Sequence, residues 1–161
     1  NDRANLMKKN LQRLNFKKNI TVKNILKIKD KKKYDIVLLD APCTSVGTIR
    51  RNPEIFYRKT IPNFKKIISI QNNLLEKAKL IVKKNGVIIY MVCSFLKEEG
   101  EDQINLFLKK NNNYKLNHFK TKNKFYNRFI NKNGSIYILP QKVDDQFFID
   151  GFFAAKIIKY D

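Results

Sequence analysis

Apolar positions recur along this chain with two different periods, which predict helices and strands in alternation. Helical spacing occurs in residues 2–14 and again in residues 97–110, where acidic residues occupy the first turn. Between them, a longer amphipathic segment begins at Pro62, a residue that suits the first helical position, and is expected to stop at Gly86. The pattern therefore predicts three helices.

Two short runs predict buried strands, because apolar residues dominate both of their faces. Residues 34–40 and 87–94 have this composition, which is typical of central strands in a covered parallel sheet. Residues 19–28 predict a strand that runs into a loop. Weaker strands are expected in residues 114–119, 135–140 and 151–160. Strands that alternate with helices predict one α/β domain with a mainly parallel sheet.

Chemically useful side chains follow both buried strands. Asp40, Pro42 and Cys43 come at the end of the first strand, and Cys93 comes at the end of the second. Ligands of such sheets bind beyond the carboxyl ends of the strands. Two adjacent strands would therefore bring both thiols into one crevice. A thiol with a lowered pKa in that crevice would be a nucleophile.

Spacing alone leaves simpler interpretations of these residues open. Each cysteine also fits a small buried hydrophobe at a strand end, and Asp40 is of a type that caps turns. Arg50 and Arg51 follow Cys43 closely enough to lower its pKa or to hold a phosphate. They equally fit a solvated pair of loop residues.

The charge of the chain favours a polyanionic partner. Lys and Arg number 34 against 14 Asp and Glu, which gives a formal net charge of +20. Nucleic acid is the first candidate and an anionic membrane surface the second, although lysine on solvated faces would also account for part of the excess. The apolar runs are shorter than the roughly 18 residues of a membrane span.

The two cysteines favour free thiols in a reducing compartment. Cys43 and Cys93 do not form a C-x-x-C pair, and His118 is the single histidine, so a structural metal site is not expected. The chain begins at Asn1 rather than at a methionine. We therefore expect a fragment or a processed piece.

Four segments resemble one known family. They are "RANLMKKNLQRLNF" at 3–16, "DAPCTSVGTIRRNPEI" at 40–55, "YMVCSFLKEEGEDQI" at 90–104 and "LPQKVDDQFFIDGFFAAKI" at 139–157. In this order they resemble the Fmu/Sun family of RNA cytosine-C5 methyltransferases. The resemblance covers nearly the whole chain and rests on two cysteine segments with the family's spacing.

The resemblance implies a Rossmann-like class I methyltransferase sheet that lacks its first two strands, with residues 1–161 as the C-terminal part of the catalytic domain. It implies transfer of a methyl group from S-adenosylmethionine to C5 of cytosine in RNA, through a bond between a cysteine and C6. The expected substrate is 16S ribosomal RNA, with transfer RNA as the alternative. A monomeric, cytoplasmic enzyme without membrane attachment is expected.

The resemblance also assigns roles to individual residues. Cys93 would be the nucleophile, and Cys43 would assist product release. Asp40 would contact both the base and the cofactor, and Pro42 would shape the pocket beside them. Asn24 stands where the family has an aspartate that accepts a hydrogen bond from the adenine of the cofactor, and its carbonyl oxygen can also accept one.

Other assignments concern RNA and the core. Arg50 and Arg51 are predicted to contact the RNA substrate. Four aromatic residues near the end of the chain are expected in the core rather than as platforms for bases: Phe147, Phe148, Phe152 and Phe153.

One departure from the family bears on activity. The first glycine of the chain is Gly47, so the glycine-rich loop that binds the cofactor in the family is missing. A chain without the first two strands would also expose a sheet edge and part of its core, so we expect it to be poorly stable and inactive by itself. A basic RNA-binding remnant without catalysis is the first alternative, and a small cysteine hydrolase is the second.

Overall fold

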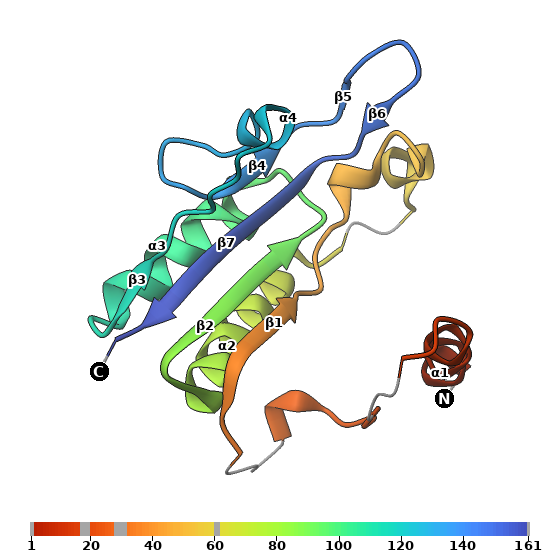
Figure 1. Cartoon of the computed structure of the whole chain (residues 1–161). Helices are drawn as coiled ribbons and strands as arrows, with labels where there is room; N and C mark the ends of the chain where they lie inside the picture. Colours follow the sequence, from red (N-terminus) through yellow and green to blue (C-terminus); the bar gives the residue numbers. More distant parts are fainter. Residues whose placement is uncertain (1, 17–19, 28–31, 60–61, 161) are drawn as a thin grey trace.

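The computed structural model describes residues 2–16, 20–27, 32–59 and 62–160 (Figure 1). The α-helices in these ranges are α1 (Asp2–Arg13), α2 (Phe64–Ile81), α3 (Glu101–Lys110) and the short α4 (Lys124–Asn127). Short 3₁₀ helices are η1 (Ile25–Lys27), η2 (Val46–Thr48), η3 (Pro53–Tyr57) and η4 (Lys97–Glu99). The strands are β1 (Tyr34–Asp40), β2 (Val82–Val92), β3 (Tyr114–Leu116), β4 (Ile136–Ile138), β5 (Gln141–Lys142), β6 (Phe148–Ile149) and β7 (Phe152–Lys159).

The main sheet has the order β1-β2-β7-β3, and β4 pairs with the same edge of β7 as β3 does. β1 and β2 are parallel, and β7 is antiparallel to each of its neighbours. All other strands of this sheet therefore point in one direction. The predicted parallel character is right for strand direction, but β1–β2 is the one parallel pair among the described residues, because the reversed β7 lies in the middle.

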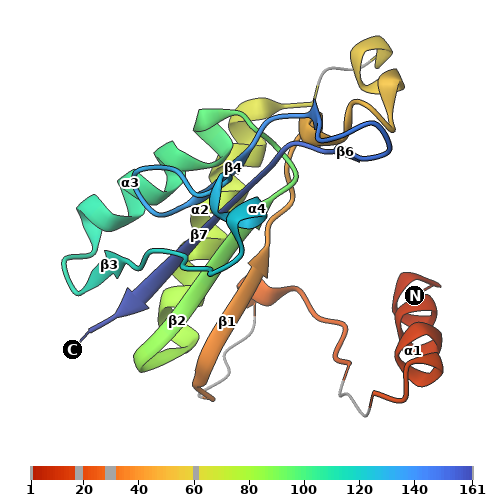
Figure 2. The same cartoon turned by 45° about the horizontal axis from the view of Figure 1, so that its top comes forward.

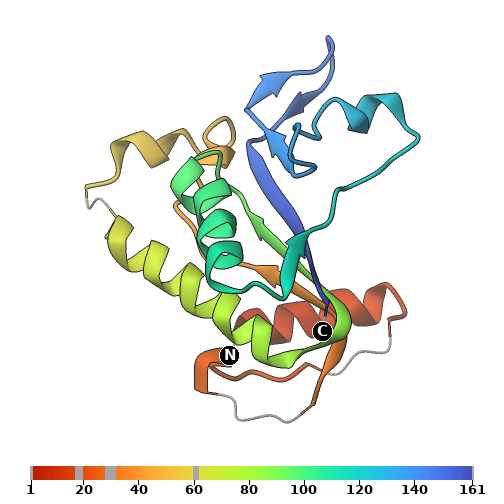
Figure 3. The same ribbon diagram turned by 90° about the vertical axis from the view of Figure 1, so that its left-hand side faces the viewer.

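Helices α2 and α3 cover one face of this sheet (Figure 3). The core lies between them, with Leu75 and Phe107 from the helices packed against Ile88 and Tyr90 of β2. On the other face, Ile36 and Leu38 of β1 are each 63% exposed. The prediction of a central strand covered on both faces is thus wrong for β1, which forms the edge of the described sheet.

The strand predicted for residues 19–28 is not formed in the described part, 20–27. That segment contains the turn η1, which lies against α2. A strand needs a neighbour for its hydrogen bonds. In the described residues β1 pairs with β2 alone, and no further strand lies beside residues 20–27.

Predicted helix ends shift by a few residues. Asn63, rather than Pro62, begins α2, since its side chain accepts a hydrogen bond from the Lys66 N–H as an N-cap does. α2 ends at Ile81 and β2 follows at once, so Gly86 lies within the strand and does not stop the helix. Its missing side chain leaves room for β1, because a Cβ there would lie 2.9 Å from the Asp35 carbonyl oxygen.

The predicted first helix forms, but it stands apart from the sheet. α1 has no buried residue, and Figure 2 shows it separated from the strands. Its apolar stripe is exposed, with Leu6 at 62% and Met7 at 55%. The helix is therefore set by local periodicity and not by packing on the described sheet.

Candidate active site

The two thiols meet beyond the carboxyl ends of β1 and β2. The parallel ladder pairs Asp40 with Met91, and the Ala41 N–H extends it by donating to the Met91 carbonyl at 3.0 Å. The two strands therefore end side by side, in the upper part of Figure 1. Cys43 Sγ lies 3.3 Å from Cys93 Sγ. The prediction that adjacent strands bring the two thiols together is confirmed.

The pKa values of the two thiols shift in opposite directions. A hydrogen bond from Cys43 lowers the pKa of Cys93 to about 6, with a further contribution from the Ser45 hydroxyl, whose oxygen lies 3.4 Å from Cys93 Sγ. The pKa of Cys43 is raised, because its thiol forms the hydrogen bond to Cys93 and because the group is partly buried. The pKa of Cys93 is therefore the lowered one of the pair, and that of Cys43 the raised one.

A buried acid, Glu99, fastens the loop that carries Cys43. Its carboxyl oxygens accept hydrogen bonds from the Thr44 N–H at 2.8 Å and from the Thr44 hydroxyl at 2.6 Å. The Gln71 side chain of α2 donates both to Glu99, at 3.2 Å, and to the Pro42 carbonyl, at 3.0 Å. Glu99 itself is fully buried. These bonds fix both cysteine loops relative to each other and to α2.

Sequence reasoning missed the role of Glu99. The acids of "KEEGED" were interpreted as favourable charges at the start of a helix, and the next two, Glu101 and Asp102, do occupy the first turn of α3. The available signal was a pair of glutamates a few residues after a strand-end cysteine. It does not by itself indicate which acid turns inward.

A contact between two glycines brings a third segment to the site. The Gly47 N–H donates to the Cys93 carbonyl at 3.1 Å, and the Gly151 N–H donates to the Gly47 carbonyl at 2.7 Å. A Cβ on Gly47 would lie 2.0 Å from the Gly151 oxygen. Only glycine allows this approach. The segment just before β7 is thereby held against the loop of Cys43.

The two arginines are placed differently from the prediction. Arg50 Nε lies 3.4 Å from Asp150 Oδ1, and Arg51 forms an ion pair and hydrogen bond with Asp150 Oδ2. The pKa of Cys43 is raised, so the expected lowering of that pKa by these arginines is wrong. The low pKa of Cys93 comes from the Cys43 thiol and the Ser45 hydroxyl. They are also not a freely solvated pair. Contact of either arginine with RNA stays a prediction.

The remaining predicted residues divide into two groups. Asp40 and Pro42 are exposed at the carboxyl end of β1, and the charge of Asp40 is close enough to oppose ionisation of Cys93. Asn24 lies in the segment that packs on α2, and its side-chain oxygen accepts a hydrogen bond from the Leu26 N–H at 3.0 Å. The structure brings Asp40 and Pro42 to the thiols and does not bring Asn24 there.

Aromatic side chains near the site are exposed, contrary to part of the prediction. Phe153 is buried, but Phe147 and Phe148 are 62% and 52% exposed on the β5–β6 hairpin. The Arg50 guanidinium lies over the Phe148 ring, 5.5 Å from its centroid. The core interpretation is thus wrong for these two phenylalanines. Phe56 and Tyr57 of η3 are also exposed, and the sequence pattern did not distinguish them.

Two searches of the described residues gave no site of another kind. No group of three or more His, Cys, Asp or Glu side chains in these ranges is arranged to hold a metal ion. No helix among them has the length and apolarity needed to cross a membrane.

The sheet and its paired thiols define the class of protein. Strand order β1-β2-β7-β3, with a reversed β7, is that of a Rossmann-like class I methyltransferase, as predicted, and one solved structure that it resembles is described as a methyltransferase homolog protein. The chain belongs to the family described as 16S rRNA methyltransferase RsmB/F, which it matches over residues 1–158.

Curated relatives support this membership. The chain is 31% identical over 161 residues to ribosomal RNA small subunit methyltransferase B of Yersinia enterocolitica, which covers 98% of this chain and 34% of the relative. It is 33% identical over 126 residues to the protein of the same name from Enterobacter sp. (strain 638), covering 78% of this chain and 26% of the relative. The chain thus spans about a third or less of their lengths.

Solved structures agree with the fold. The crystal structure of NSun6 from Pyrococcus horikoshii with SFG matches 96% of this chain and 38% of its own, with a TM-score of 0.76 and 25% identity. A methyltransferase homolog protein from the same organism matches 98% of this chain and 50% of its own, with a TM-score of 0.71 and 27% identity.

Proposed function

We propose that this chain carries the reactive cysteines of an RNA cytosine-C5 methyltransferase, with Cys93 as the nucleophile. The observation that supports this most directly is the sulfur pair, in which Cys43 stabilises a thiolate at Cys93 from 3.3 Å. A thiolate near neutral pH is what addition to a pyrimidine requires. Membership of an rRNA methyltransferase family supplies the substrate class.

The cysteines perform separate steps in the proposed reaction. C5 of cytosine is a poor nucleophile until Cys93 Sγ bonds to C6 and shifts electron density onto C5. S-adenosylmethionine supplies the methyl group that C5 then takes. A water molecule takes the C5 proton, the electrons of that C–H bond re-form the double bond between C5 and C6, the bond between C6 and sulfur breaks, and Cys93 returns as a thiolate. Cys43, whose thiol already contacts that sulfur, stabilises it as it leaves.

The residues present fit part of a cofactor site. Asp40 and Pro42 are exposed beside the thiols. A cofactor and a base bound at the thiols would need such accessible residues. Asn24 lies away from these loops, and the chain has no glycine before Gly47. We therefore assign Asp40 and Pro42 to the cofactor side, and Asn24 as a cofactor ligand keeps little support. NSun6, a structural neighbour, was solved with SFG, an analogue of S-adenosylmethionine.

The substrate proposed is 16S ribosomal RNA, by the name of the family, with transfer RNA as the alternative. A cytoplasmic, monomeric protein and an inactive isolated chain stay predictions. A non-catalytic RNA-binding remnant is the competing function. It would bind RNA through its basic surface but form no covalent bond to cytosine.

The test is a cysteine comparison in the full-length protein. With substrate RNA and S-adenosylmethionine, Cys93→Ala should abolish both methyl transfer, by at least about a thousandfold, and the protein–RNA adduct seen on a denaturing gel. Cys43→Ala should accumulate that adduct and release little product. Ser69→Ala, on the exposed side of α2, is the control. An adduct that survives Cys93→Ala and disappears in Cys43→Ala would reverse the assignment. No methyl transfer by wild type, together with no adduct in Cys43→Ala, would favour the remnant.

A further inference from the structure

We propose that an apolar pocket beside α4 binds an unstacked base of the RNA, outside the catalytic crevice. The pocket lies between α4, β4 and the segment that joins β6 to β7, and it encloses about 340 Å³. That volume is within the roughly 300–1,000 Å³ of typical small-molecule sites. The proposal rests on the RNA methyltransferase function proposed above and adds a second contact for the same RNA.

The walls of the pocket suit a flat aromatic ring. Phe119, Tyr126, Phe129 and Phe152 contribute rings, and isoleucines fill the space between them. Phe129 is 7% exposed, while Tyr126 is 59% exposed. The pocket thus has a fixed buried wall and an accessible tyrosine. Bases stack on such rings without regard to sequence, because every base has a π face.

The charge around the pocket complements a phosphate backbone. No acidic residue occurs from residue 103 to residue 143, a stretch that holds nine basic ones. These are Lys109, Lys110, Lys115, Lys120, Lys122, Lys124, Arg128, Lys132 and Lys142. Among the described residues, Lys120, Lys122 and Lys124 make no ion pair. The Arg128 guanidinium lies over Phe125 and Phe129, 4.7 and 4.8 Å from their centroids.

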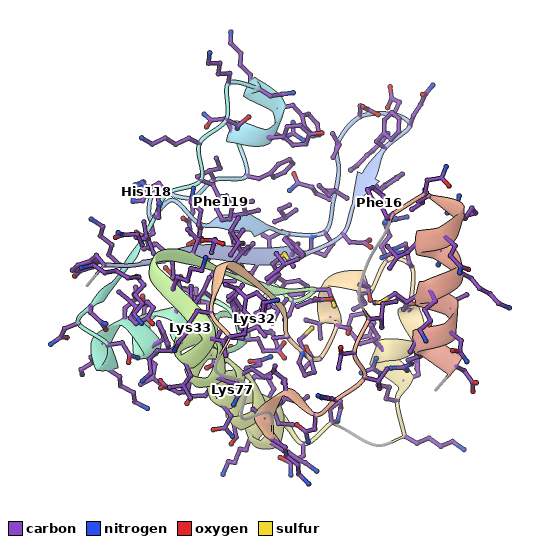
Figure 4. The ribbon with its side chains drawn as sticks, turned by 60° about the horizontal axis from the view of Figure 1, so that its bottom comes forward. Phe16, Lys32, Lys33, Lys77, His118 and Phe119 are labelled. Atoms are coloured by element: carbon purple, nitrogen blue, oxygen red, sulfur yellow. The ribbon has the colours of Figure 1, made fainter. Side chains whose placement is uncertain are left out.

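A polyanion is therefore the occupant that the surface favours. The apolar lining alone would suit a protein segment equally well. Binding of a protein segment would not explain the unpaired lysines on the segment that leads into α4. Figure 4 labels Phe119 and its neighbour His118 on that segment. Ring walls with unpaired cations around them match the base and phosphate of one nucleotide.

The pocket is joined to the catalytic crevice through one short segment. Phe152, a wall of the pocket, follows Gly151, whose N–H donates to the Gly47 carbonyl at 2.7 Å. The Gly47 N–H in turn donates to the Cys93 carbonyl. An RNA strand that crosses residues 150–152 would thus place its target cytosine at the thiols and another base in the pocket. The pocket would fix where along the RNA the reactive base falls.

The test is binding and turnover of a single-stranded RNA that contains the target cytosine, with the full-length protein. Tyr126→Ala should raise the dissociation constant about tenfold, as loss of one stacked base does. Tyr126→Phe should restore binding. The control is Tyr160→Ala, because Tyr160 is 40% exposed and also has a lysine over its ring, but lies outside the pocket.

A second measurement locates the contact. RNA carrying 4-thiouridine at single positions should crosslink to the peptide with Tyr126 from one position at a constant distance from the target cytosine. Equal binding by wild type and Tyr126→Ala, or an equal loss in Tyr160→Ala, overturns the pocket. The pocket is also overturned if Tyr126→Ala lowers the stability of the protein but does not weaken RNA binding. That result would indicate a protein segment as occupant.

The two proposals fail separately in this design. Methyl transfer by wild type, together with unchanged binding by Tyr126→Ala, removes the pocket and leaves the methyltransferase. Binding that depends on Tyr126, without methyl transfer by wild type or an adduct in Cys43→Ala, keeps the pocket as an RNA site and removes the methyltransferase.

Discussion

The loops around the thiols and the described parts of the N-terminal stretch, 2–16 and 20–27, are organised in opposite ways. In the thiol loops, Thr44, Ser94 and Glu99 are buried polar residues with hydrogen-bond partners. In the N-terminal stretch, α1 buries nothing, and η1 touches the rest of the described chain through α2. The geometry of the thiols thus depends on contacts within residues 40–151 and not on the N-terminal stretch.

The difference shows where the site is preorganised. Buried polar groups cost free energy unless they are paired, so a network in which they are paired holds one arrangement. Exposed apolar side chains, such as Leu6 and Leu38, impose no such arrangement. The chain therefore holds the proposed nucleophile in one arrangement. Of the proposed cofactor site, it supplies only Asp40 and Pro42.

The largest expected effect comes from the same substitution made in both regions. Leu75→Ala removes a fully buried side chain of α2 and should lower the free energy of unfolding by about 2–5 kcal/mol. Leu6→Ala, at a leucine that is 62% exposed, should change it by less than about 0.5 kcal/mol. Urea unfolding followed by circular dichroism measures both. Similar losses at the two positions would mean that α1 packs against the sheet, and the contrast would disappear.

A smaller effect is expected from the buried acid. Glu99→Gln replaces one acceptor oxygen by an NH₂ group that faces the Thr44 or Gln71 donors, and should cost about 1–3 kcal/mol in unfolding free energy. Glu101→Gln, two residues further on in the first turn of α3, is the matched control and should cost under about 1 kcal/mol. If both variants unfold alike, Glu99 does not hold the loops.

The smallest effect concerns proton affinity. A thiolate is the reactive form, so alkylation of Cys93 by iodoacetamide should rise with pH around its pKa of about 6, well below the ordinary 9.0. Cys43→Ala removes the main hydrogen bond to Cys93, so the midpoint should move upward. If the midpoint rises from about 6 to about 8, the rate at pH 7 should fall roughly tenfold, because the thiolate fraction drops from about nine-tenths to about one-tenth. Mass spectrometry of the modified peptide gives the rate, and an unchanged midpoint would remove Cys43 as the cause.

Local patterns predicted the helices α1, α2 and α3, the strands β1, β2, β3, β4 and β7, and the meeting of the thiols. Two buried strands that each end in a cysteine needed one assumption, that they are neighbours, and the ladder between Asp40 and Met91 confirms it. The edge position of β1 could not be predicted, because an apolar run has the same composition whether one or both of its faces are covered. The missing strand at 20–27 has a similar cause, since a strand depends on a partner elsewhere.

The rest of the site depends on contacts distant in sequence. Asp150 meets Arg50 and Arg51 across about 100 residues. Glu99 meets Thr44 across 55 residues. Spacing along the chain carries no information about such pairs. The position of the arginines in the sequence predicts that they contact the thiol or RNA. In the fold, both arginines contact the carboxylate of Asp150.

The direction of β7 has a consequence for how such a protein diversifies. Because β7 is antiparallel to its neighbours, the chain must return to the edge of the sheet that carries the thiols before β7 begins. The β5–β6 hairpin is part of this return. Its two ends are tied by the Val143 N–H, which donates to the Phe147 carbonyl at 2.8 Å. Insertions at the exposed tip can therefore lengthen or shorten it without disturbing the sheet.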